Sequence, residues 1–376
     1  VRLTDGVYTL LFFGVNDMKK KVLVLFGGVS SEHEVSLNSA KSVIDNIPRD
    51  RYDVLPMGIT SDGSFYLYSG DIADLPEDKW LADPSKLESA VISCDRAHHG
   101  IIHTATGEVE RVDAVFPVLH GMNGEDGTIQ GLLTIAGIPF VGCNAEASAV
   151  CMDKAVTNAL ADFYGIPQAK WTAFDRHAYA ADKALLLKTA ADKLGFPIFV
   201  KPANTGSSVG VTKVCSFDEL APACEKAFEF DKKIVLEEGI DGVEIECAVL
   251  GNEEPIASVV GEIVPCNDFY DYDAKYLAGD SELHIPARLP EEKLEAVRAA
   301  ALDIRNTIDA EMADAVNELI KELVANAGKD AADLAANIAM DSYGVTAAIK
   351  SGYNTVASLS NKIFNTKDKY EFMMSL

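Results

Sequence analysis

Residues 201–210 combine one lysine, two serines and two glycines directly after an apolar run. The segment reads Lys201-Pro-Ala-Asn-Thr-Gly-Ser-Ser-Val-Gly210. Backbone N–H groups of such a loop can surround phosphate oxygens, and the ammonium group of Lys201 adds a positive charge. The spacing differs from that of the G-x-x-x-x-G-K-[ST] phosphate loop. The pattern therefore leaves two interpretations, a phosphate-binding loop and a tight structural turn.

A second glycine turn joins an apolar run to a predicted helix and reads Phe26-Gly-Gly-Val-Ser-Ser-Glu-His-Glu-Val-Ser36. Glycines there would let the backbone approach a ligand, and the helix N-terminus offers free N–H groups. The carboxylates of Glu32 and Glu34 would repel a phosphate, but they suit an ammonium group. The alternative interpretation is that the serines and acids only cap the helix.

Two further segments carry side chains suited to binding or catalysis. His120 follows an apolar strand in a glycine-rich loop, and ligands of open α/β sheets bind at the carboxyl ends of strands. The segment Asp268–Tyr276 surrounds Lys275 with phenols and carboxylates, and a lysine there could neutralise a phosphoryl group during its transfer. A surface histidine and a packed aromatic edge are the corresponding structural interpretations.

The charge of the chain limits its partners. It has 33 basic and 58 acidic residues, for a net charge of −25. Such a surface repels nucleic acid and anionic lipid headgroups, so we expect neither nucleic acid nor a membrane as partner. An anionic small molecule can still bind where lysines and N–H groups are concentrated in one place.

The cysteines and the apolar runs indicate a cytoplasmic protein. The 7 cysteines show no C-x-x-C pair, so reduced thiols are expected rather than a disulfide framework or a zinc site. The apolar run Val7–Val15 is too short to span a bilayer and lacks the pattern of an export signal.

The 376 residues predict two or three domains. Short β-branched runs alternate with helical stretches up to Gly142, which predicts an open α/β sheet, and a second α/β layer follows. The expected elements include strands at Val22–Phe26, Asp53–Ile59, Ala114–Leu119, Phe140–Gly142, Ile198–Lys201 and Ile234–Glu237, and helices at Lys154–Tyr164, Asp182–Leu194 and Phe217–Phe228.

The sequence pattern changes after residue 243. The β-rich runs Glu244–Gly251 and Pro255–Val264 read as a hairpin, with sheet continuing to about Arg288. Apolar residues then recur every three to four positions, which predicts an amphipathic helix.

We expect five parts: a leader over 1–17 outside the fold, with translation starting at Met18; an N-terminal α/β substrate domain over 18–143; a central domain over 144–238; the start of a C-terminal domain over 239–302; and a divergent helical tail over 303–376.

In this order, the segments resemble the D-alanine–D-alanine ligases, a family of the ATP-grasp superfamily that makes the dipeptide of bacterial peptidoglycan. The resemblance covers about residues 21–302. Its motifs are Gly27-Gly-Val-Ser-Ser-Glu-His-Glu-Val-Ser-Leu37, Leu119-His-Gly-Met-Asn-Gly-Glu-Asp-Gly-Thr-Ile-Gln-Gly131, Lys201-Pro with Gly206-Ser-Ser-Val-Gly210, and Tyr270-Asp-Tyr-Asp-Ala-Lys-Tyr276. The resemblance implies an ATP-grasp fold, in which an N-terminal open α/β sheet domain joins central and C-terminal α/β lobes that enclose the nucleotide.

The resemblance also implies roles for individual residues. Glu32 would pair with the ammonium group of the first D-alanine, supported by Ser207 and Tyr276, and these three are the expected catalytic residues. His120 would line the amino-acid site. The expected ATP-binding residues are Lys154 and Lys201 at the phosphates, the closing loop of Gly206, Ser207, Ser208, Val209 and Gly210, Lys275 at the γ-phosphate, and Glu237 and Glu244 at adenine and ribose.

The implied reaction is the ATP-dependent ligation of two D-alanine molecules through an acyl phosphate. ATP is the co-substrate, and Mg²⁺, or alternatively Mn²⁺, is the implied metal. Tyr276 resembles the residue of ligases that take D-alanine rather than D-lactate as second substrate. The family commonly forms dimers, so a homodimer through the N-terminal domain is expected.

The resemblance ends before the metal ligands of the family. Past the point equivalent to Leu302, the family has an arginine-containing strand with an aspartate, and then a strand with Glu-x-Asn that holds Mg²⁺. The tail of this chain has neither, and its acids at Glu311, Asp314, Glu318 and Glu322 have the spacing of a solvated helix face. We therefore assign no metal ligands from the sequence.

This departure leaves three hypotheses about activity. The chain could be a ligase that turns over poorly because its last segment has been replaced, or one whose metal site is restored by a partner. It could instead bind the nucleotide and D-alanine without turnover. It could also be an ATP-grasp ligase for another amino acid.

Overall fold

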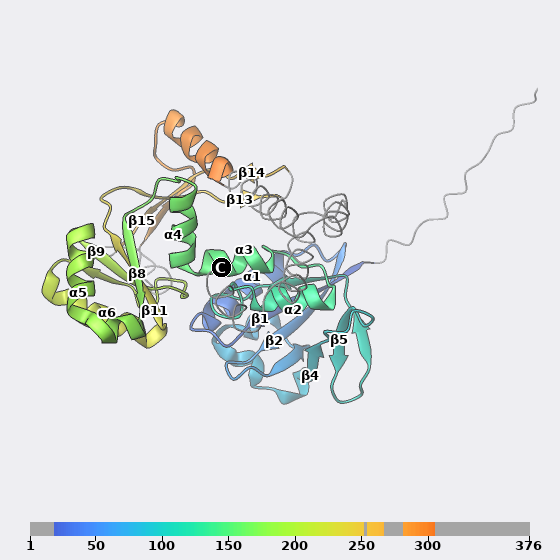
Figure 1. Ribbon diagram of the computed structural model, residues 1–376. Helices are drawn as coiled ribbons and strands as arrows, with labels where there is room; N and C mark the ends of the chain where they lie inside the picture. Colours follow the sequence, from blue (N-terminus) through green and yellow to red (C-terminus); the bar gives the residue numbers. More distant parts are fainter. Residues whose placement is uncertain (1–18, 252–253, 267–280, 305–376) are drawn as a thin grey trace, which may run out of the picture. The chain divides into compact units, whose positions relative to one another are not determined.

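The computed structural model describes residues 19–251, 254–266 and 281–304. These residues divide into two compact units, one comprising 19–242 with 265–266 and 281–282, and the other comprising 243–251 and 254–264 with 283–304. The first unit contains two successive sheets with their helices (Figure 1). Within the described ranges, no helix combines the length and the apolar composition needed to cross a bilayer.

The first sheet has seven strands, and the last three of them at one side of the sheet are parallel. β1 pairs in parallel with β2 on one side and with β7 on the other, whereas the strands from β2 to β6 form an antiparallel meander. In spatial order the strands are β6 (Val109–Arg111), β5 (Gly100–His103), β4 (Leu87–Ile92), β3 (Phe65–Tyr68), β2 (Tyr52–Ile59), β1 (Lys20–Gly27) and β7 (Ala114–Pro117).

Helices cover both faces of β1. Alternate residues Val22, Val24 and Phe26 enter one apolar cluster, which includes Leu37 of α1. The residues between them enter a second cluster with residues of α2. A strand that is buried on both faces reads as a continuous apolar run, which explains Val22–Phe26. The helical elements here are α1 (His33–Asn46), η1 (Ile72–Asp74), η2 (Pro76–Leu81), η3 (Pro84–Lys86), α2 (Thr128–Ala136) and α3 (Ala145–Met152).

This topology brings two of the sequence motifs to one edge. β1 ends at Gly27 and leads into the loop before α1, while β7 ends at Pro117 and leads into the loop of His120. Because β1 and β7 are parallel neighbours, both loops leave from the same edge of the sheet.

The second sheet is antiparallel, in the order β10-β9-β11-β8. One face packs on α5 and α6 in a single apolar cluster, to which β9 contributes Ile198 and Val200 and β11 contributes Ile234 and Leu236. Side chains alternate between the faces of a strand, so Lys201 points to the other face. The elements are α4 (Lys154–Phe163), β8 (Trp171–Asp175), α5 (Arg176–Leu194), β9 (Ile198–Pro202), β10 (Thr212–Val214), α6 (Phe217–Phe230) and β11 (Lys233–Glu238).

The remaining strands are short. β12 (Glu244–Glu246), β15 (Gly261–Val264) and β16 (Glu282–His284) form a three-stranded sheet. β13 (Val249–Leu250) pairs antiparallel with β14 (Ile256–Ala257), as the predicted hairpin requires. Residues 291–304 are helical up to the end of the described range.

The α/β class predicted from the sequence is confirmed, but several details differ. Phe140 makes one isolated bridge with Val115 instead of starting a strand. The helix α5 begins at Arg176, six positions before the predicted start, and the non-helical φ of −150° at Asp182 interrupts it there. The strands β8 and β10 and the meander from β3 to β6 were not predicted, because short edge strands carry a weak alternation signal.

One ion pair of the second unit makes a testable contribution to stability. The carboxylate of Glu262 accepts hydrogen bonds from the guanidinium of Arg288 (2.7 and 3.1 Å) and from its backbone N–H (2.9 Å). These bonds lower the pKa of Glu262 from 4.5 to about 2. A depressed carboxyl pKa means stability that is present above pH 4.5 and is lost as the pH falls towards about 2.

We therefore expect hydrogen-exchange protection of the β15 amides to fall as the pH decreases from 4.5 towards about 2. The Glu262→Gln variant should show lower protection at neutral pH and little further change across this range. Glu295→Gln, which removes an exposed partner of Arg298, is the matched control and should behave as the unmodified chain. The same acid dependence in Glu262→Gln and the unmodified chain would show that this contact is not responsible.

Candidate functional site

Glu32 is a buried acid at the start of α1. Its side chain does not cap the helix, and the residue is only 4% exposed. Oε1 accepts a hydrogen bond from Ser207 Oγ, whereas the buried Oε2 has no hydrogen-bond partner within the described residues. A buried carboxylate oxygen without a partner is costly, and a bound donor or cation would relieve that cost. The geometry therefore favours the ammonium interpretation of this acid over the capping interpretation.

Two glycines make room for this carboxylate. A Cβ atom at Gly121 would lie 2.2 Å from Glu32 Oε2, and one at Gly206 would lie 2.6 Å from the same oxygen. Gly121 also has a φ of +67°, which disfavours other residues. Both motifs thus need glycine because the acid occupies the space of a side chain.

The loop between β9 and β10 is compact and locally strained. Ser207 and Ser208 have φ values of +49° and +59°, a left-handed conformation that is uncommon for serine. Inside the loop, Val209 N–H donates to Gly206 O (3.0 Å) and Thr205 Oγ1 donates to Val209 O (3.1 Å). Strain of this kind concentrates at functional sites, and here it accompanies the contact of Ser207 with Glu32.

Lys201 and Glu237 form an ion pair on the face of the second sheet opposite its helices. Lys201 lies opposite Val235 in the register, so Glu237 is its diagonal neighbour on β11. Lys201 Nζ lies 2.5 Å from Glu237 Oε2, and Asn158 Nδ2 donates to Glu237 Oε1 (3.0 Å). Burial acts to raise the pKa of Glu237, but the charge and hydrogen bond of Lys201, with help from Asn158 and Lys154, lower it overall.

Lys154 connects α4 to the serine–glycine loop. Its ammonium group donates to Thr205 O (2.6 Å) and to Ala203 O (3.3 Å). Burial lowers the pKa of Lys154, as does the positive charge of Lys201, against an opposing effect of Glu237. The two lysines therefore act on each other and on Glu237. The third lysine of the predicted phosphate site, Lys275, lies outside the described residues.

His120 directly precedes Gly121, whose backbone approaches the carboxylate of Glu32. Its Nε2 is 3.0 Å from Ser39 Oγ, and its Nδ1 is 3.8 Å from Glu125. Although burial acts to raise it, the pKa of Glu125 is lowered by the nearby imidazole of His120 and by the hydrogen bond from Gly121 N–H (2.8 Å). His120 also lines a cavity of about 290 Å³.

The predicted roles of Glu244 and Tyr276 stay predictions. Glu244 begins β12 and belongs to the second unit. Tyr276, like Lys275, lies outside the described residues. Conversely, the sequence analysis missed Asn158 and Glu125. Asn158 follows Lys154 by four positions on α4, and this spacing on one helix face was the signal that could have identified it.

The described residues do not fit a magnesium site. Across residues 19–251, 254–266 and 281–304, no group of three or more His, Cys, Asp or Glu side chains is placed to hold a metal ion. The acids of the tail, at Glu311, Asp314, Glu318 and Glu322, lie outside these ranges. No reaction step can therefore be derived through a metal from this structure.

Two family models match most of the chain. The one described as "D-ala D-ala ligase N-terminus" matches residues 21–143, and the one described as "D-ala D-ala ligase C-terminus" matches residues 160–322. The second match extends past residue 302, where the sequence motifs were expected to end.

Curated relatives and solved structures agree with these matches. A D-alanine–D-alanine ligase of Caldicellulosiruptor bescii is 47% identical over 285 residues, covering 75% of this chain and 77% of the relative. One of Acetivibrio thermocellus is 46% identical, with coverages of 77% and 81%.

The structure of VanG D-Ala:D-Ser ligase from Enterococcus faecalis has a TM-score of 0.69 at 41% identity, covering 77% of this chain and 83% of that one. The D-alanine–D-alanine ligase from Coxiella burnetii has a TM-score of 0.64 at 29% identity, with coverages of 77% and 78%. The fold is thus the ATP-grasp fold, and the chain belongs to the D-alanine–D-alanine ligase family.

Proposed function

We propose that the chain ligates two D-alanine molecules to D-alanyl-D-alanine for peptidoglycan synthesis, with ATP as co-substrate. The observation that carries the proposal is the buried carboxylate of Glu32, which has one oxygen on Ser207 and the other without a partner among the described residues. An amino acid offers an ammonium group to such an oxygen and leaves its own carboxylate free to react.

In the proposal, Glu32 binds the ammonium group of the first D-alanine and Ser207 holds Glu32 in position. His120 would line the same site, because the next residue in the chain, Gly121, approaches the carboxylate of Glu32. Tyr276 would complete the support of Glu32. This arrangement selects an α-amino acid by charge and position, whereas the methyl group of alanine must be selected by packing.

The nucleotide would bind along the face of the second sheet opposite α5 and α6. Lys154 and Lys201 would contact its phosphates, and the loop of Gly206, Ser207, Ser208, Val209 and Gly210 would close over them. Glu237 and Glu244 would face adenine and ribose, and Lys275 would meet the γ-phosphate. The Lys201–Glu237 ion pair supports this placement, because phosphate binding can replace Glu237 as the counter-charge of Lys201.

The reaction itself needs little covalent chemistry from the protein. A carboxylate oxygen of the first D-alanine attacks the γ-phosphorus, the bond to the β-phosphate oxygen breaks, and an acyl phosphate and ADP form. The amine of the second D-alanine then adds to the acyl carbon, and phosphate leaves from the tetrahedral intermediate. Holding the reactants in line can supply about 7–11 kcal/mol of the barrier reduction.

The proposed metal is Mg²⁺, or alternatively Mn²⁺, although the described residues offer no ligand set for it. This observation favours a second candidate function, a chain that binds ATP and D-alanine without turnover.

The proposed partners remain D-alanine and ATP in the cytoplasm, without nucleic acid or membrane, since the net charge is −25. A homodimer through residues 18–143 is proposed from the family resemblance alone.

Release of ADP separates the two candidates. With ATP, Mg²⁺ and D-alanine, we expect ADP release that depends on D-alanine and forms D-alanyl-D-alanine, measured by a coupled assay and by mass spectrometry. ATP binding without ADP release would support the binding-only function. ADP release that requires a different amino acid would instead identify another ligase specificity.

Substitution of Glu32 tests its proposed role. In Glu32→Gln, loss of the charge should weaken D-alanine binding by about tenfold or more, because hydrogen bonds to charged groups contribute about 1.5–3 kcal/mol. ATP binding should change little. Calorimetric titration with each ligand measures the two affinities separately.

The matched control is Glu34→Gln, which removes an exposed acid two residues further along the same helix. It should leave both affinities unchanged. An equal loss of D-alanine and ATP binding in Glu32→Gln would contradict the assignment of the ammonium site.

A further inference from the structure

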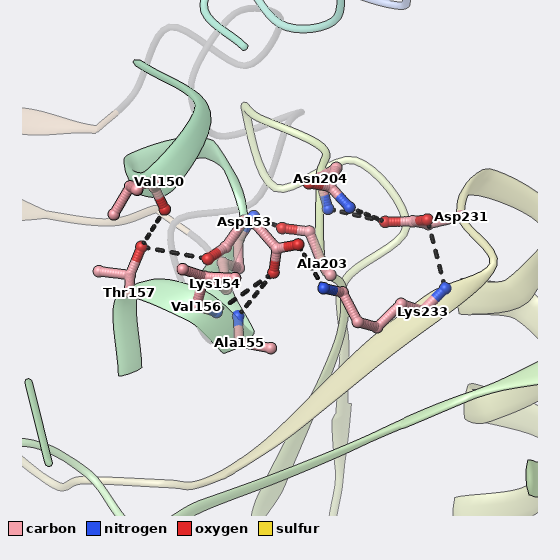
Figure 2. A network of polar contacts seen from close by, with 10 residues as sticks. All are labelled: Val150, Asp153, Lys154, Ala155, Val156, Thr157, Ala203, Asn204, Asp231 and Lys233. Carbon is pink, nitrogen blue, oxygen red and sulfur yellow. Dashed lines mark hydrogen bonds and ion pairs between the residues drawn. The ribbon is translucent and has the colours of Figure 1, made fainter. Parts of the chain in front are cut away.

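Three segments far apart in the sequence meet at the base of the loop that leads to Gly206 (Figure 2). Lys154 N–H donates to Ala203 O (3.1 Å), and Ala203 N–H donates to Lys233 O (3.0 Å). The start of α4, the end of β9 and the start of β11 are thus joined through the backbone. Any shift of one segment must be transmitted to the others.

Asp231 holds the loop base through Asn204. Its Oδ2 accepts from both the backbone N–H and the side-chain amide of Asn204, each at 2.8 Å, and its Oδ1 accepts from Lys233 N–H (3.2 Å). One carboxylate therefore takes three hydrogen bonds from two segments. Asn204 lies only two positions before Gly206.

A second carboxylate holds α4 to the same place. Asp153 Oδ1 caps the helix by accepting from Ala155 N–H (3.1 Å) and Val156 N–H (3.3 Å), and its Oδ2 pairs with Lys233 Nζ. The side chain of Asp153 is 15% exposed and that of Lys233 is 31% exposed. The ion pair is thus partly protected from solvent, which keeps it stronger than a surface pair.

The two carboxylates hold the two partners of one hydrogen bond, which joins the ammonium group of Lys154 to the carbonyl of Thr205. Asp153 fixes the first turn of α4, the helix that carries Lys154. Asp231 fixes Asn204, the neighbour of Thr205, and the carbonyl of Thr205 accepts a hydrogen bond from Lys154 Nζ (2.6 Å). Neither acid is predicted to touch a ligand. Their common effect is to set where the loop of residues 206–210 starts.

We propose that Asp231 and Asn204, together with the Asp153–Lys233 ion pair, are positioning residues for the phosphate-binding loop. This inference rests on the proposed function, since it requires that the loop binds ATP. A loop that is already held at its base loses less conformational freedom when the nucleotide binds. Removal of the Asp231–Asn204 contact should therefore weaken ATP binding more than D-alanine binding.

The test compares Asp231→Asn, Asn204→Asp and the double variant with the unmodified full chain. Calorimetric titration with ATP in magnesium-containing buffer, and separately with D-alanine, gives the affinities, and thermal unfolding without ligand reports stability. Each single variant should bind ATP about tenfold more weakly, because Asp231→Asn replaces hydrogen bonds to a charged acceptor with weaker neutral ones and Asn204→Asp sets two carboxylates against each other. The double variant should recover part of the affinity, because the amide introduced at position 231 can donate to the carboxylate introduced at position 204.

Two further variants keep the test decisive. If the single charge variants do not fold, Asn204→Ala takes their place. It removes only the side-chain hydrogen bond and should weaken ATP binding by about fivefold. The matched control Asp192→Asn breaks the exposed Lys188–Asp192 pair on α5 and should not change ATP binding.

The outcomes separate this inference from the function on which it rests. Folded single variants that bind ATP as tightly as the unmodified chain would overturn the positioning role and leave the proposed function standing. A lower unfolding temperature with unchanged ATP affinity would likewise overturn it, since that is the result of a purely structural contact. An unmodified chain that binds no ATP would overturn the proposed function, and the positioning role with it.

Discussion

The burial of one carboxylate that is only half satisfied governs much of the local structure. Glu32 keeps one oxygen without a partner among the described residues, which a folded protein tolerates only where the surroundings fix the group or a ligand completes it. Gly121 and Gly206 approach so closely that neither can carry a side chain without displacing the acid. Ser207 reaches the acid from a left-handed backbone conformation. Two motifs 85 residues apart, at Gly121 and Gly206, are therefore constrained by the same carboxylate.

The second constraint is the balance of charge around the lysines. In a chain of net charge −25, a cluster of free ammonium groups would attract many competing acids. Three lysines near the loop of residues 206–210 are instead individually compensated: Lys201 by Glu237, Lys233 by Asp153, and Lys154 by two backbone carbonyls. Carbonyl groups compensate a charge less completely than a carboxylate does. Burial and the positive charge of Lys201 lower the pKa of Lys154.

The described residues carry the fold of the family without a group of metal-binding side chains. The matched regions carry the fold and the residues that would hold the substrates, whereas the described residues contain no metal-binding group. Binding and phosphoryl transfer make different demands, since a nucleotide can be held by lysines and N–H groups alone. A chain can therefore keep the binding architecture of its family while its capacity for turnover depends on a separate segment.

Much of the secondary structure could be predicted from the sequence, because the physical signals are local. The apolar run Val22–Phe26 is continuous since both faces of β1 are covered, and the hairpin of β13 and β14 follows from two β-rich runs. The short strands β8 and β10 were not predicted, because their own residues carry only a weak local signal. Their few residues pair with β11 and β9, and these partners, rather than their own pattern, make them strands.

The sequence by itself determined which residue types were available: a glycine turn with an acid, a serine–glycine loop with a lysine, and a histidine after a strand. Only the tertiary structure decided that Glu32 and Ser207 touch, that Asn158 rather than another amide reaches Glu237, and that Asp231 holds Asn204. The physical reason is that these contacts join segments far apart in the chain. No local pattern encodes such pairings, because they depend on the strand order and on how closely the backbones approach.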